Sequence, residues 1–372
     1  MSGLYVHIPY CSSRCIYCGF FSSTGKKNQS EYIDAVLKEL EMRTTEMFSK
    51  PETVYFGGGT PSFLPIPMLD RLVRGIAERI DVSRVGEWTM ECNPDDVSPE
   101  LAHWLSSSPI NRVSMGVQTF SDERLRWLHR RHSSKQVKEA VSLLRQSGIQ
   151  NLSLDLMYGF PKQTIEEWKA DISECLSLHP EHISAYSLMY EEGTPLFSML
   201  EKGIVTEIDE DLSLRMFEIL VDSLTEAGYE HYEISNFSLP RFQSRHNSNY
   251  WQQVPYLGIG AGAHSYDLSQ RWNNVCNIES YISSVEAGRI DSEYEETTPE
   301  IRYNDIVTTA LRTRHGIDLT MLQESFRSYL LSQAESHIAH GRLTVDGSHV
   351  HLTRKGIFTS DDIMSDLIFL PE

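Results

Sequence analysis

Along the first 228 residues, short apolar runs alternate regularly with longer stretches in which apolar residues recur at a helical spacing. Short runs typical of β-strands are each followed by a longer stretch in which apolar residues recur every three to four positions. The strands are predicted at residues 4–10, 53–58, 87–93, 112–118, 151–159 and 182–190. The helices are predicted at residues 30–47, 67–80, 99–107, in the region before Gln146, in TIEEWKADISECLSL and near 209–227. Six β-α units in succession predict a parallel sheet with right-handed crossovers.

The alternation predicts the fold class. Six units are expected to form an α/β fold, namely a partial (β/α)6 barrel, with an open doubly wound sheet as the alternative. Residues 1–228 are therefore assigned to a barrel domain. Functional residues of such barrels lie at the carboxyl ends of the strands, so we expect the chemistry of this chain there.

The pattern changes after Gly228. Residues 229–298 are rich in aromatic residues, Gly, Asn and His and show no helical period, which indicates a connecting segment that is functional or packed against another domain. In residues 299–372, predicted helices are followed by a hairpin whose turn is Asp346-Gly347. This order predicts a mainly helical, winged-helix-like C-terminal domain. We favour a packing role for it over DNA binding, because the chain is acidic.

Composition and charge narrow the class of protein. The 372 residues carry a net charge of −19, which gives no general electrostatic footprint for nucleic acid or an anionic membrane. No apolar run approaches the roughly 20 residues that span a bilayer, and the start of the chain has no pattern of a signal peptide. Cys92, Cys175 and Cys276 are scattered singly, as in proteins of reducing compartments. We therefore expect a cytoplasmic protein with no nucleic-acid partner.

Three cysteines lie close together after the first predicted strand, in the stretch YVHIPYCSSRCIYCGFF. Cys11, Cys15 and Cys18 have the spacing C-x3-C-x2-C. Thiolates suit iron–sulfur clusters, and three of them on a four-iron cluster leave one iron open to an outside ligand. A zinc site would need a fourth ligand at short spacing, yet no Cys or His lies between residues 19 and 91. A catalytic thiol would need one cysteine and a base rather than three cysteines. The loop therefore predicts a [4Fe–4S] cluster.

Polar residues follow the later strands at the expected end of the barrel. The second strand ends in GGGTP (57–61), where glycines allow the backbone to approach a ligand closely. Glu91 and Asn93 end the third strand, and Gln118 ends the fourth, with Arg130 a helix later. Asp155 lies inside the apolar run of the fifth strand, where a carboxylate must be paired or hydrogen-bonded. Each alone would be interpreted as a structural polar group or a helix cap. Their convergence on one barrel mouth favours a binding site for a polar ligand.

The cysteine spacing, with an aromatic residue before the third cysteine, resembles the signature of the radical S-adenosylmethionine (SAM) superfamily. The resemblance implies that the methionine group of SAM chelates the open iron and that the cluster donates an electron that cleaves the sulfonium. The whole chain resembles the branch related to oxygen-independent coproporphyrinogen III oxidase. The segments that carry this resemblance are YFGGGTPSFL, ECNPDD, NRVSMGVQTF, LDLMYGFPKQT, HISAYSLMYEEGTP, YEISNF, SRHNSNYW, YLGIGAGAHSY and LTRKG. The SAM-pocket residues that the resemblance implies are Tyr5, Gly58, Gly59, Thr60, Glu91, Gln118, Arg130 and Asp155.

Two departures separate the chain from the oxidase itself. The oxidase carries a fourth cysteine two residues beyond the third, where this chain has Phe20. The oxidase also has a long N-terminal arm, whereas only ten residues precede Cys11 here. Both departures are features of the HemW-type heme chaperones, which the chain resembles in length and motif. They make coproporphyrinogen III oxidase activity doubtful and leave open whether the chain is an enzyme.

The same resemblance includes the motif H-N-x-x-Y-W, which is present as His246, Asn247, Tyr250 and Trp251. A histidine beside flat aromatic rings suits an axial ligand of heme iron and the walls of a porphyrin site. The residues alone favour a structural, hydrogen-bonded histidine. The resemblance reverses this preference and makes His246 the predicted heme contact, with His264 as the second candidate.

Three hypotheses follow for the function. The first is a heme carrier that holds a [4Fe–4S] cluster, SAM and heme and delivers heme to an acceptor protein. The second is an enzyme that oxidatively decarboxylates coproporphyrinogen III in porphyrin biosynthesis. The third, a winged-helix regulator with an iron–sulfur sensor, is disfavoured by the acidic charge and by the SAM-type residues. The resemblance leaves open an acceptor at a membrane and a homodimer.

Overall fold

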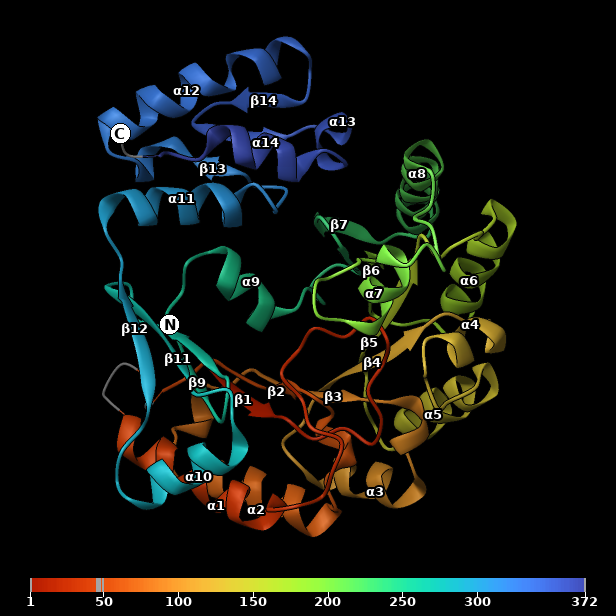
Figure 1. The fold of residues 1–372 in the computed structure, drawn as a ribbon, viewed down its shortest axis with the longest axis vertical. Helices are drawn as coiled ribbons and strands as arrows, with labels where there is room; N and C mark the ends of the chain where they lie inside the picture. Colours follow the sequence, from red (N-terminus) through yellow and green to blue (C-terminus); the bar gives the residue numbers. More distant parts are fainter. Residues whose placement is uncertain (1, 45–47, 49, 371–372) are drawn as a thin grey trace.

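The six predicted β-α units are all present. The computed structural model describes residues 2–44, 48 and 50–370. The parallel strands of the units are β1 (Gly3–Ile8), β2 (Thr53–Gly58), β3 (Glu87–Cys92), β4 (Arg112–Gln118), β5 (Asn151–Tyr158) and β6 (His182–Ser187). The principal helices are α1 (Gln29–Arg43), α2 (Ile66–Ala77), α3 (Pro99–Ser107), α5 (Ser134–Gln146), α6 (Ile165–Ser177) and α8 (Glu210–Glu226). The predicted partial barrel is confirmed (Figure 1).

Short elements complete the units. They are α4 (Asp122–Trp127), α7 (Pro195–Glu201) and the 3₁₀ turns η1 (Pro61–Phe63), η2 (Val82–Arg84) and η3 (Pro94–Asp96). Helices α5 and α6 begin where capping boxes predict, with Ser133 and Thr164 as the N-caps. The first helix was predicted at 30–47, but α1 ends at Arg43, and residues 45–47 lie outside the described part of the chain.

Further strands extend the sheet on both sides of the six units. They are β7 (Glu230–Glu233), β8 (Asn236–Ser238), β9 (Tyr256–Ile259), β10 (His264–Tyr266), β11 (Gln270–Asn274) and β12 (Ser292–Glu296), with helices α9 (Arg245–Trp251) and α10 (Ile278–Glu286) between them. Strand β9 lies parallel to β1, while the other five pair in antiparallel fashion. The resulting order is β12-β11-β10-β9-β1-β2-β3-β4-β5-β6-β8-β7. Thus α9 is a helix in the segment that was expected to show no helical period.

The period-2 alternation of each strand separates the outer core from the barrel interior. On β4, Val113 and Met115 are fully buried in the main hydrophobic core, whereas Ser114 and Gln118 line an internal cavity. On β3, Met90 is likewise in the core and Glu91 faces the cavity. The strand pattern therefore directs apolar side chains to the helices and polar side chains to the interior.

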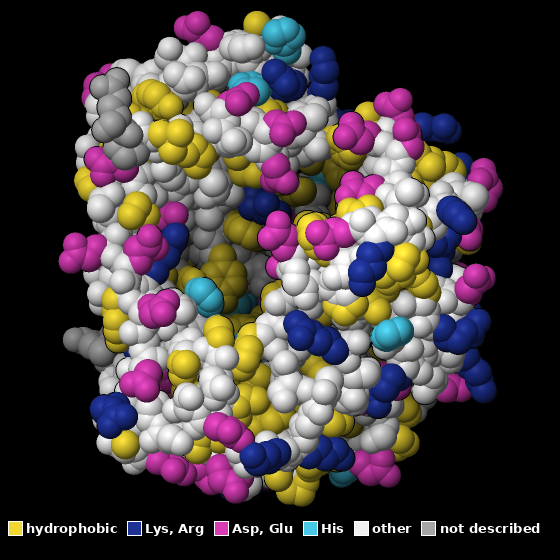
Figure 2. Space-filling view, in the orientation of Figure 1, with side chains coloured by type: hydrophobic (Ala, Val, Ile, Leu, Met, Phe, Trp, Pro, Cys, Tyr) yellow, Lys and Arg dark blue, Asp and Glu magenta, His cyan; other side chains and the backbone are white. Residues whose placement is uncertain are grey.

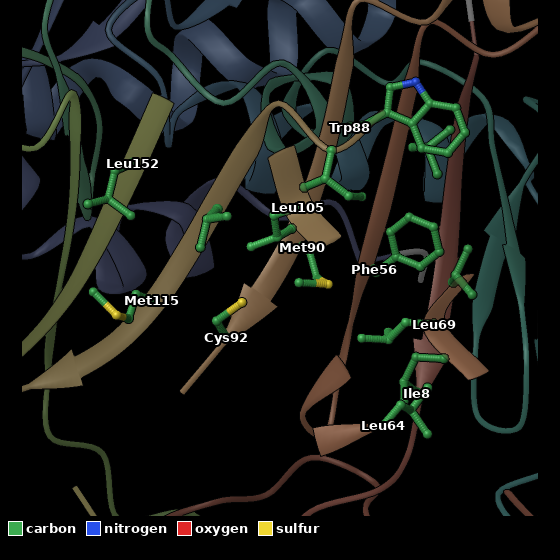
Figure 3. Close-up of a cluster of buried hydrophobic side chains, with 14 of the residues drawn as sticks. Ile8, Phe56, Leu64, Leu69, Trp88, Met90, Cys92, Leu105, Met115 and Leu152 are labelled. Carbon is green, nitrogen blue, oxygen red and sulfur yellow. The ribbon is translucent and has the colours of Figure 1, made fainter. Parts of the chain in front are cut away.

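The core between the strands and the helices is tightly filled by large side chains (Figure 3). Phe56 of β2 and Trp88 of β3 stack with ring centroids 6.3 Å apart. Leu69 of α2 and Leu105 of α3 meet them from the helical layer. This burial stabilises the strand positions, so the polar residues at the strand ends are held on a rigid scaffold.

The C-terminal part has its own hydrophobic core, formed by residues between Tyr303 and Leu367. Its elements are α11 (Pro299–Ala310), β13 (Ile317–Asp318), η4 (Leu319–Met321), α12 (Glu324–Ala339), β14 (Leu343–Asp346), β15 (His349–Leu352), α13 (Arg354–Ile357) and α14 (Ser360–Leu367). The strands form a small sheet in the order β13-β15-β14, and the predicted hairpin is its β14-β15 pair. Figure 1 shows this unit at one end of the molecule, with α11 facing α9.

Among the described residues, no helix is long and apolar enough to cross a bilayer.

Candidate functional site

A cavity of about 870 Å³ occupies the carboxyl-end side of the barrel. Figure 2 shows this side of the molecule hollowed between the C-terminal unit and the barrel. The predicted site residues that line the cavity are Cys11, Cys15, Cys18, Gly58, Gly59, Thr60, Glu91, Gln118, Arg130 and Asp155. As expected for residues near the carboxyl ends of barrel strands, these residues surround one cavity, although they are up to 144 positions apart in the chain, from Cys11 to Asp155.

The three-cysteine loop follows β1 and is closed at its base by backbone hydrogen bonds. The Cys11 N–H donates to the Ser23 carbonyl at 2.9 Å, and the Ser23 N–H donates to the Pro9 carbonyl at 2.6 Å. The thiols of Cys11, Cys15 and Cys18 are free and partly exposed. The loop thus presents three unpaired thiols to one cavity.

Neighbouring polar side chains contact the sulfur atoms of Cys11 and Cys15. The Sγ of Cys11 lies 3.5 Å from the Thr60 hydroxyl, and Arg130 donates to the Sγ of Cys15 at 3.7 Å. Burial raises the pKa of the Cys11 and Cys18 thiols, while the Arg130 guanidinium acts in the opposite direction on Cys11. Metal binding would therefore release protons from the Cys11 and Cys18 thiols, and Arg130 favours the ionised form of Cys11.

The GGGTP segment is docked against the start of the cysteine loop. The Gly59 N–H donates to the Ile8 carbonyl at 2.8 Å, and the Thr60 N–H donates to the Tyr10 carbonyl at 2.9 Å. Gly58 has a φ of 107°, and a Cβ at that position would lie 2.5 Å from the His7 ring. A Cβ at Gly59 would lie 2.8 Å from the Ile8 carbonyl oxygen. Glycine is therefore required at both positions for the two segments to meet.

Glu91 of β3 is a partly charged acid in the cavity wall. Its carboxylate accepts from the Tyr55 hydroxyl at 2.8 Å and from the Gly58 N–H at 3.2 Å. Burial raises its pKa to about 7, although both hydrogen bonds oppose this effect. Asp155 of β5 accepts from the Ser114 hydroxyl at 3.3 Å, and burial raises the pKa of this carboxyl as well.

Arg130 and Gln118 meet at the end of β4. The pairing of β4 with β5 shifts by one residue between Gly116 and Gln118, and Gln118 has a left-handed φ of 69°. A guanidinium nitrogen of Arg130 donates to the Asn93 amide oxygen at 2.7 Å and also to the Gly116 carbonyl oxygen. The arginine thereby fixes the ends of β3 and β4 next to the cysteine loop.

Two predicted residues lie outside the cavity lining. Tyr5 is hydrogen-bonded to His7 at 3.1 Å and stacks on Tyr55. His246 is 1% exposed, and its Nδ1 and Nε2 lie 2.8 Å from the hydroxyls of Thr53 and Tyr250. Burial lowers the pKa of His246 to about 3, so its ring is neutral.

The second heme candidate has a different environment. The His264 side chain is exposed, and no hydrogen bond to its ring is found among the described residues. The imidazole of His264 is therefore more accessible to a ligand than the imidazole of His246, whose ring nitrogens are both hydrogen-bonded.

The structure adds cavity residues that the sequence pattern did not single out. The buried Arg112 stands at the start of β4 with 1% exposure and still reaches the cavity, which a search at strand ends misses. Tyr55 holds the predicted Glu91 in place through a hydrogen bond. The C-terminal unit contributes Arg312 and Phe358, and no local signal links them to the barrel.

The residues present fit a [4Fe–4S] cluster and SAM. Three free thiols and a buried Arg130 Nε without a hydrogen-bond partner face the cavity, and Gly58, Gly59 and Thr60 line it beside the cysteine loop. Within residues 2–44, 48 and 50–370, no three His, Cys, Asp or Glu side chains converge as they would on a single metal ion. The spread of the three thiols around the loop therefore suits a larger cluster rather than a mononuclear site.

Comparisons with known proteins agree with this geometry. The radical SAM superfamily model matches residues 5–175. The heme chaperone HemW of Lactococcus lactis is 34% identical over 370 residues, which cover 98% of this chain and 96% of that protein. The heme chaperone HemW of Escherichia coli is 37% identical over 264 residues, which cover 70% of this chain and 69% of that protein. The structure of coproporphyrinogen III oxidase (HemN) from E. coli superimposes with a TM-score of 0.84 at 21% identity, over 98% of this chain and 89% of that one.

Proposed function

The chain belongs to the heme chaperone HemW family of the radical SAM superfamily, and on that premise we propose that it binds heme and delivers it to an acceptor protein. In this proposal the barrel cavity holds a [4Fe–4S] cluster and SAM, and heme binds to the same protein. The proposed location is the cytoplasm, and the proposed partners are heme or another porphyrin and a heme-acceptor protein. An acceptor at a membrane and a homodimer remain predictions.

Cys11, Cys15 and Cys18 would hold the cluster and leave one iron open to the methionine group of SAM. When bound, the cluster supplies single electrons to a sulfonium placed beside it. Arg130 orients the Cys15 thiol, because its guanidinium donates to that sulfur at 3.7 Å. The base of the loop is fixed by the hydrogen bonds of Cys11 and Ser23, so the thiols are positioned before the cluster arrives.

The glycine segment and the strand-end acids would hold SAM. Gly58 and Gly59 let the backbone approach the methionine group, and Thr60 fixes the segment to the cysteine loop. Glu91 and Asp155 supply carboxylates for hydroxyl groups and for the sulfonium charge. Since burial raises the pKa of both acids, a cation beside them would favour their ionised forms.

The observation that carries the heme proposal, beside family membership, is the apolar part of the cavity wall. Phe20, Tyr186 and Met189 line the cavity and yet are 71%, 43% and 71% exposed. Large exposed apolar side chains around one cavity mark a binding site for an apolar ligand. Phe20 also occupies the position at which the related oxidases carry a further cysteine.

The residue that contacts the heme iron remains a prediction. His246 has both ring nitrogens in hydrogen bonds, so iron ligation requires its ring to leave Thr53 or Tyr250. His264 needs no such rearrangement, because its side chain is exposed. Neither histidine lines the cavity of the cluster and SAM residues, so ligation of a heme bound in that cavity requires the ligating ring to move toward it or the porphyrin to extend beyond it.

The second candidate function is oxidative decarboxylation of coproporphyrinogen III. The specific observation in its favour is the superposition on HemN, with a TM-score of 0.84. That likeness concerns the fold at 21% identity, whereas the 34% identity to a HemW chaperone extends over 98% of the chain. The carrier is therefore the better supported function.

Heme titration of the reconstituted protein tests the proposal. We expect a saturable Soret band at about one heme per chain, with the iron–sulfur content unchanged. Bovine serum albumin, which binds heme nonspecifically, and the apo-protein without a cluster serve as references. A linear, unsaturable titration that matches free heme in buffer would contradict the heme-carrier proposal.

A further inference from the structure

On the side of the C-terminal unit, the cavity wall includes the guanidinium of Arg312, which forms no ion pair with any described residue. Arg312 follows α11 and lines the cavity. Its Nε is buried and has no hydrogen-bond partner, and no carboxylate of the described residues lies within the ion-pair distance of its guanidinium. A buried guanidinium nitrogen without a partner is unfavourable, and a ligand in the cavity could complete the hydrogen bonds of the half-buried side chain.

The backbone and an aromatic ring hold Arg312 in place. Its carbonyl oxygen accepts from the Ile234 N–H at 2.9 Å, and its own N–H donates to the Thr309 carbonyl at 3.2 Å. Its guanidinium lies 5.1 Å from the ring centroid of Trp251. Stacking of this kind orients an arginine and leaves its in-plane N–H groups free to donate.

Glu233 is an acid whose carboxylate interacts electrostatically with Arg312 but is hydrogen-bonded to other groups. Glu233 is 3% exposed, and its Oε1 accepts from the Ser235 N–H at 3.0 Å and from the Asn236 side chain. The positive charge of Arg312 lowers the pKa of Glu233, against the larger effect of burial, but the two side chains form no ion pair. By contrast, Arg314, two residues further on, pairs with Glu230 at 3.2 Å.

The apolar side chains near Arg312 indicate the shape and polarity of the rest of the ligand. Phe217 and Phe358 line the same cavity, with ring centroids 6.2 Å apart, and Ile357 lies beside them. A ligand that fits this wall has a broad apolar body and an anionic group that reaches the guanidinium. Carboxylates match the planar fork of arginine through two parallel hydrogen bonds.

We propose that Arg312 is the carboxylate receptor of the cavity and that it binds a propionate of the tetrapyrrole. The inference rests on the proposed function for the identity of the ligand, and it assigns to the C-terminal unit a direct part in binding. It places the ligand between the cluster loop and Phe358, with an apolar face on the aromatic wall. It also makes the ligand a bridge between the barrel and the C-terminal unit.

The test compares heme with heme dimethyl ester, in which both carboxylates are blocked. Wild-type protein is expected to bind heme about tenfold more tightly than the ester, as for the loss of one charge-assisted contact. Arg312→Met should bind both with the same weakened affinity, and Arg312→Lys should keep part of the preference. Arg314→Met is the matched control, because it removes a neighbouring arginine that does not line the cavity, and it should behave as wild type.

The outcomes separate this inference from the proposed function. If wild type binds heme and Arg312→Met keeps the tenfold preference over the ester, the receptor assignment is wrong and the heme-carrier proposal stands. If wild type does not bind heme, both are overturned. Thermal unfolding and iron content identify a variant that has lost its fold, and in that case the Arg312→Lys comparison decides.

Discussion

The guanidinium of Arg130 donates to the Sγ of Cys15 across 3.7 Å, although the two residues are 115 positions apart in the chain. The same guanidinium fixes Asn93 and the carbonyl of Gly116, so it joins the cysteine loop to the ends of two strands. This contact links the electrostatics of the cluster site to the geometry of the barrel mouth.

Arg130→Met removes the charge but keeps much of the side-chain volume. Without the guanidinium, the Sγ of Cys15 loses a hydrogen-bond donor, and the strand ends lose two hydrogen bonds. We expect iron to be lost to a chelator several-fold faster than from wild type. The measurement is the decay of the visible cluster absorbance under anaerobic conditions. Arg126→Met is the control, since Arg126 is exposed on α4; equal decay rates in all three proteins would refute the role of Arg130.

Changing Cys11, Cys15 and Cys18 together to Ala should abolish the cluster. These cysteines project from one loop into the cavity, whereas Cys92 and Cys175 are buried in the main hydrophobic core, with Cys92 touching the cavity wall, and Cys276 is exposed. Iron analysis after reconstitution should give about four irons per chain for wild type and a background value for the triple variant. Cys276→Ala is the control and should retain its iron. A triple variant with undiminished iron would show that the ligands lie elsewhere.

Gly59→Val should separate cluster binding from SAM binding. A Cβ at Gly59 would lie within 2.9 Å of backbone atoms of Ile8, Pro9 and Tyr10, so the glycine segment must move away from the cysteine loop. The measurement is the EPR spectrum of the reduced cluster with and without SAM, and we expect the iron to remain while the SAM-induced change disappears. Gly25→Val is the control, because no atom lies within 4 Å of a Cβ there. A normal SAM response in Gly59→Val would contradict the placement.

The buried ring of His246 predicts a pH dependence of stability. Burial lowers its pKa from 6.5 to about 3, so between these pH values the histidine is protonated in the unfolded chain and neutral in the folded chain. The stability due to the neutral ring is complete above pH 6.5 and falls as the pH decreases toward 3, by about 1.4 kcal/mol per pH unit. His246→Gln should lower the free energy of unfolding by about 2 kcal/mol at neutral pH through lost hydrogen bonds, and this difference should shrink on acidification.

Urea unfolding at several pH values measures both effects, and the same variant tests the role of His246 in heme binding. If His246 is a structural residue, the folded variant should keep the wild-type Soret band. If it contacts the iron, the band should weaken or shift while the stability changes little. His264→Gln is the parallel variant, since its exposed ring has no hydrogen bond among the described residues. A stability difference that does not vary with pH would contradict the neutral buried ring.

Much of the fold was predictable because its strands and helices carry strong local patterns. The alternation on β3 and β5 marked Glu91 and Asp155 as polar residues at strand ends, and the barrel rule placed them together. The edge strands were missed because they are short and are stabilised by pairing, as β9 is beside β1. Helix α9 was missed because all seven of its residues are polar or aromatic and form no apolar stripe.

The site was predictable only where the chemistry was local. The cysteine spacing and the glycine run are signals within a few residues, whereas Arg112 reaches the cavity from the opposite end of its strand. Arg312 and Phe358 reach it from a different unit, and only the tertiary packing brings them there. The environment of His246 likewise depends on Thr53, which is 193 positions away.

The central claim is that the chain carries heme rather than oxidising coproporphyrinogen III. The most direct measurement is anaerobic incubation of the reconstituted protein with reductant, SAM, coproporphyrinogen III and heme, followed by chromatographic analysis of the porphyrins. The account predicts that heme co-elutes with the protein, that coproporphyrinogen III is recovered unchanged and that no decarboxylated product forms. Stoichiometric or catalytic formation of the decarboxylated product, without retained heme, would contradict the account and establish the oxidase.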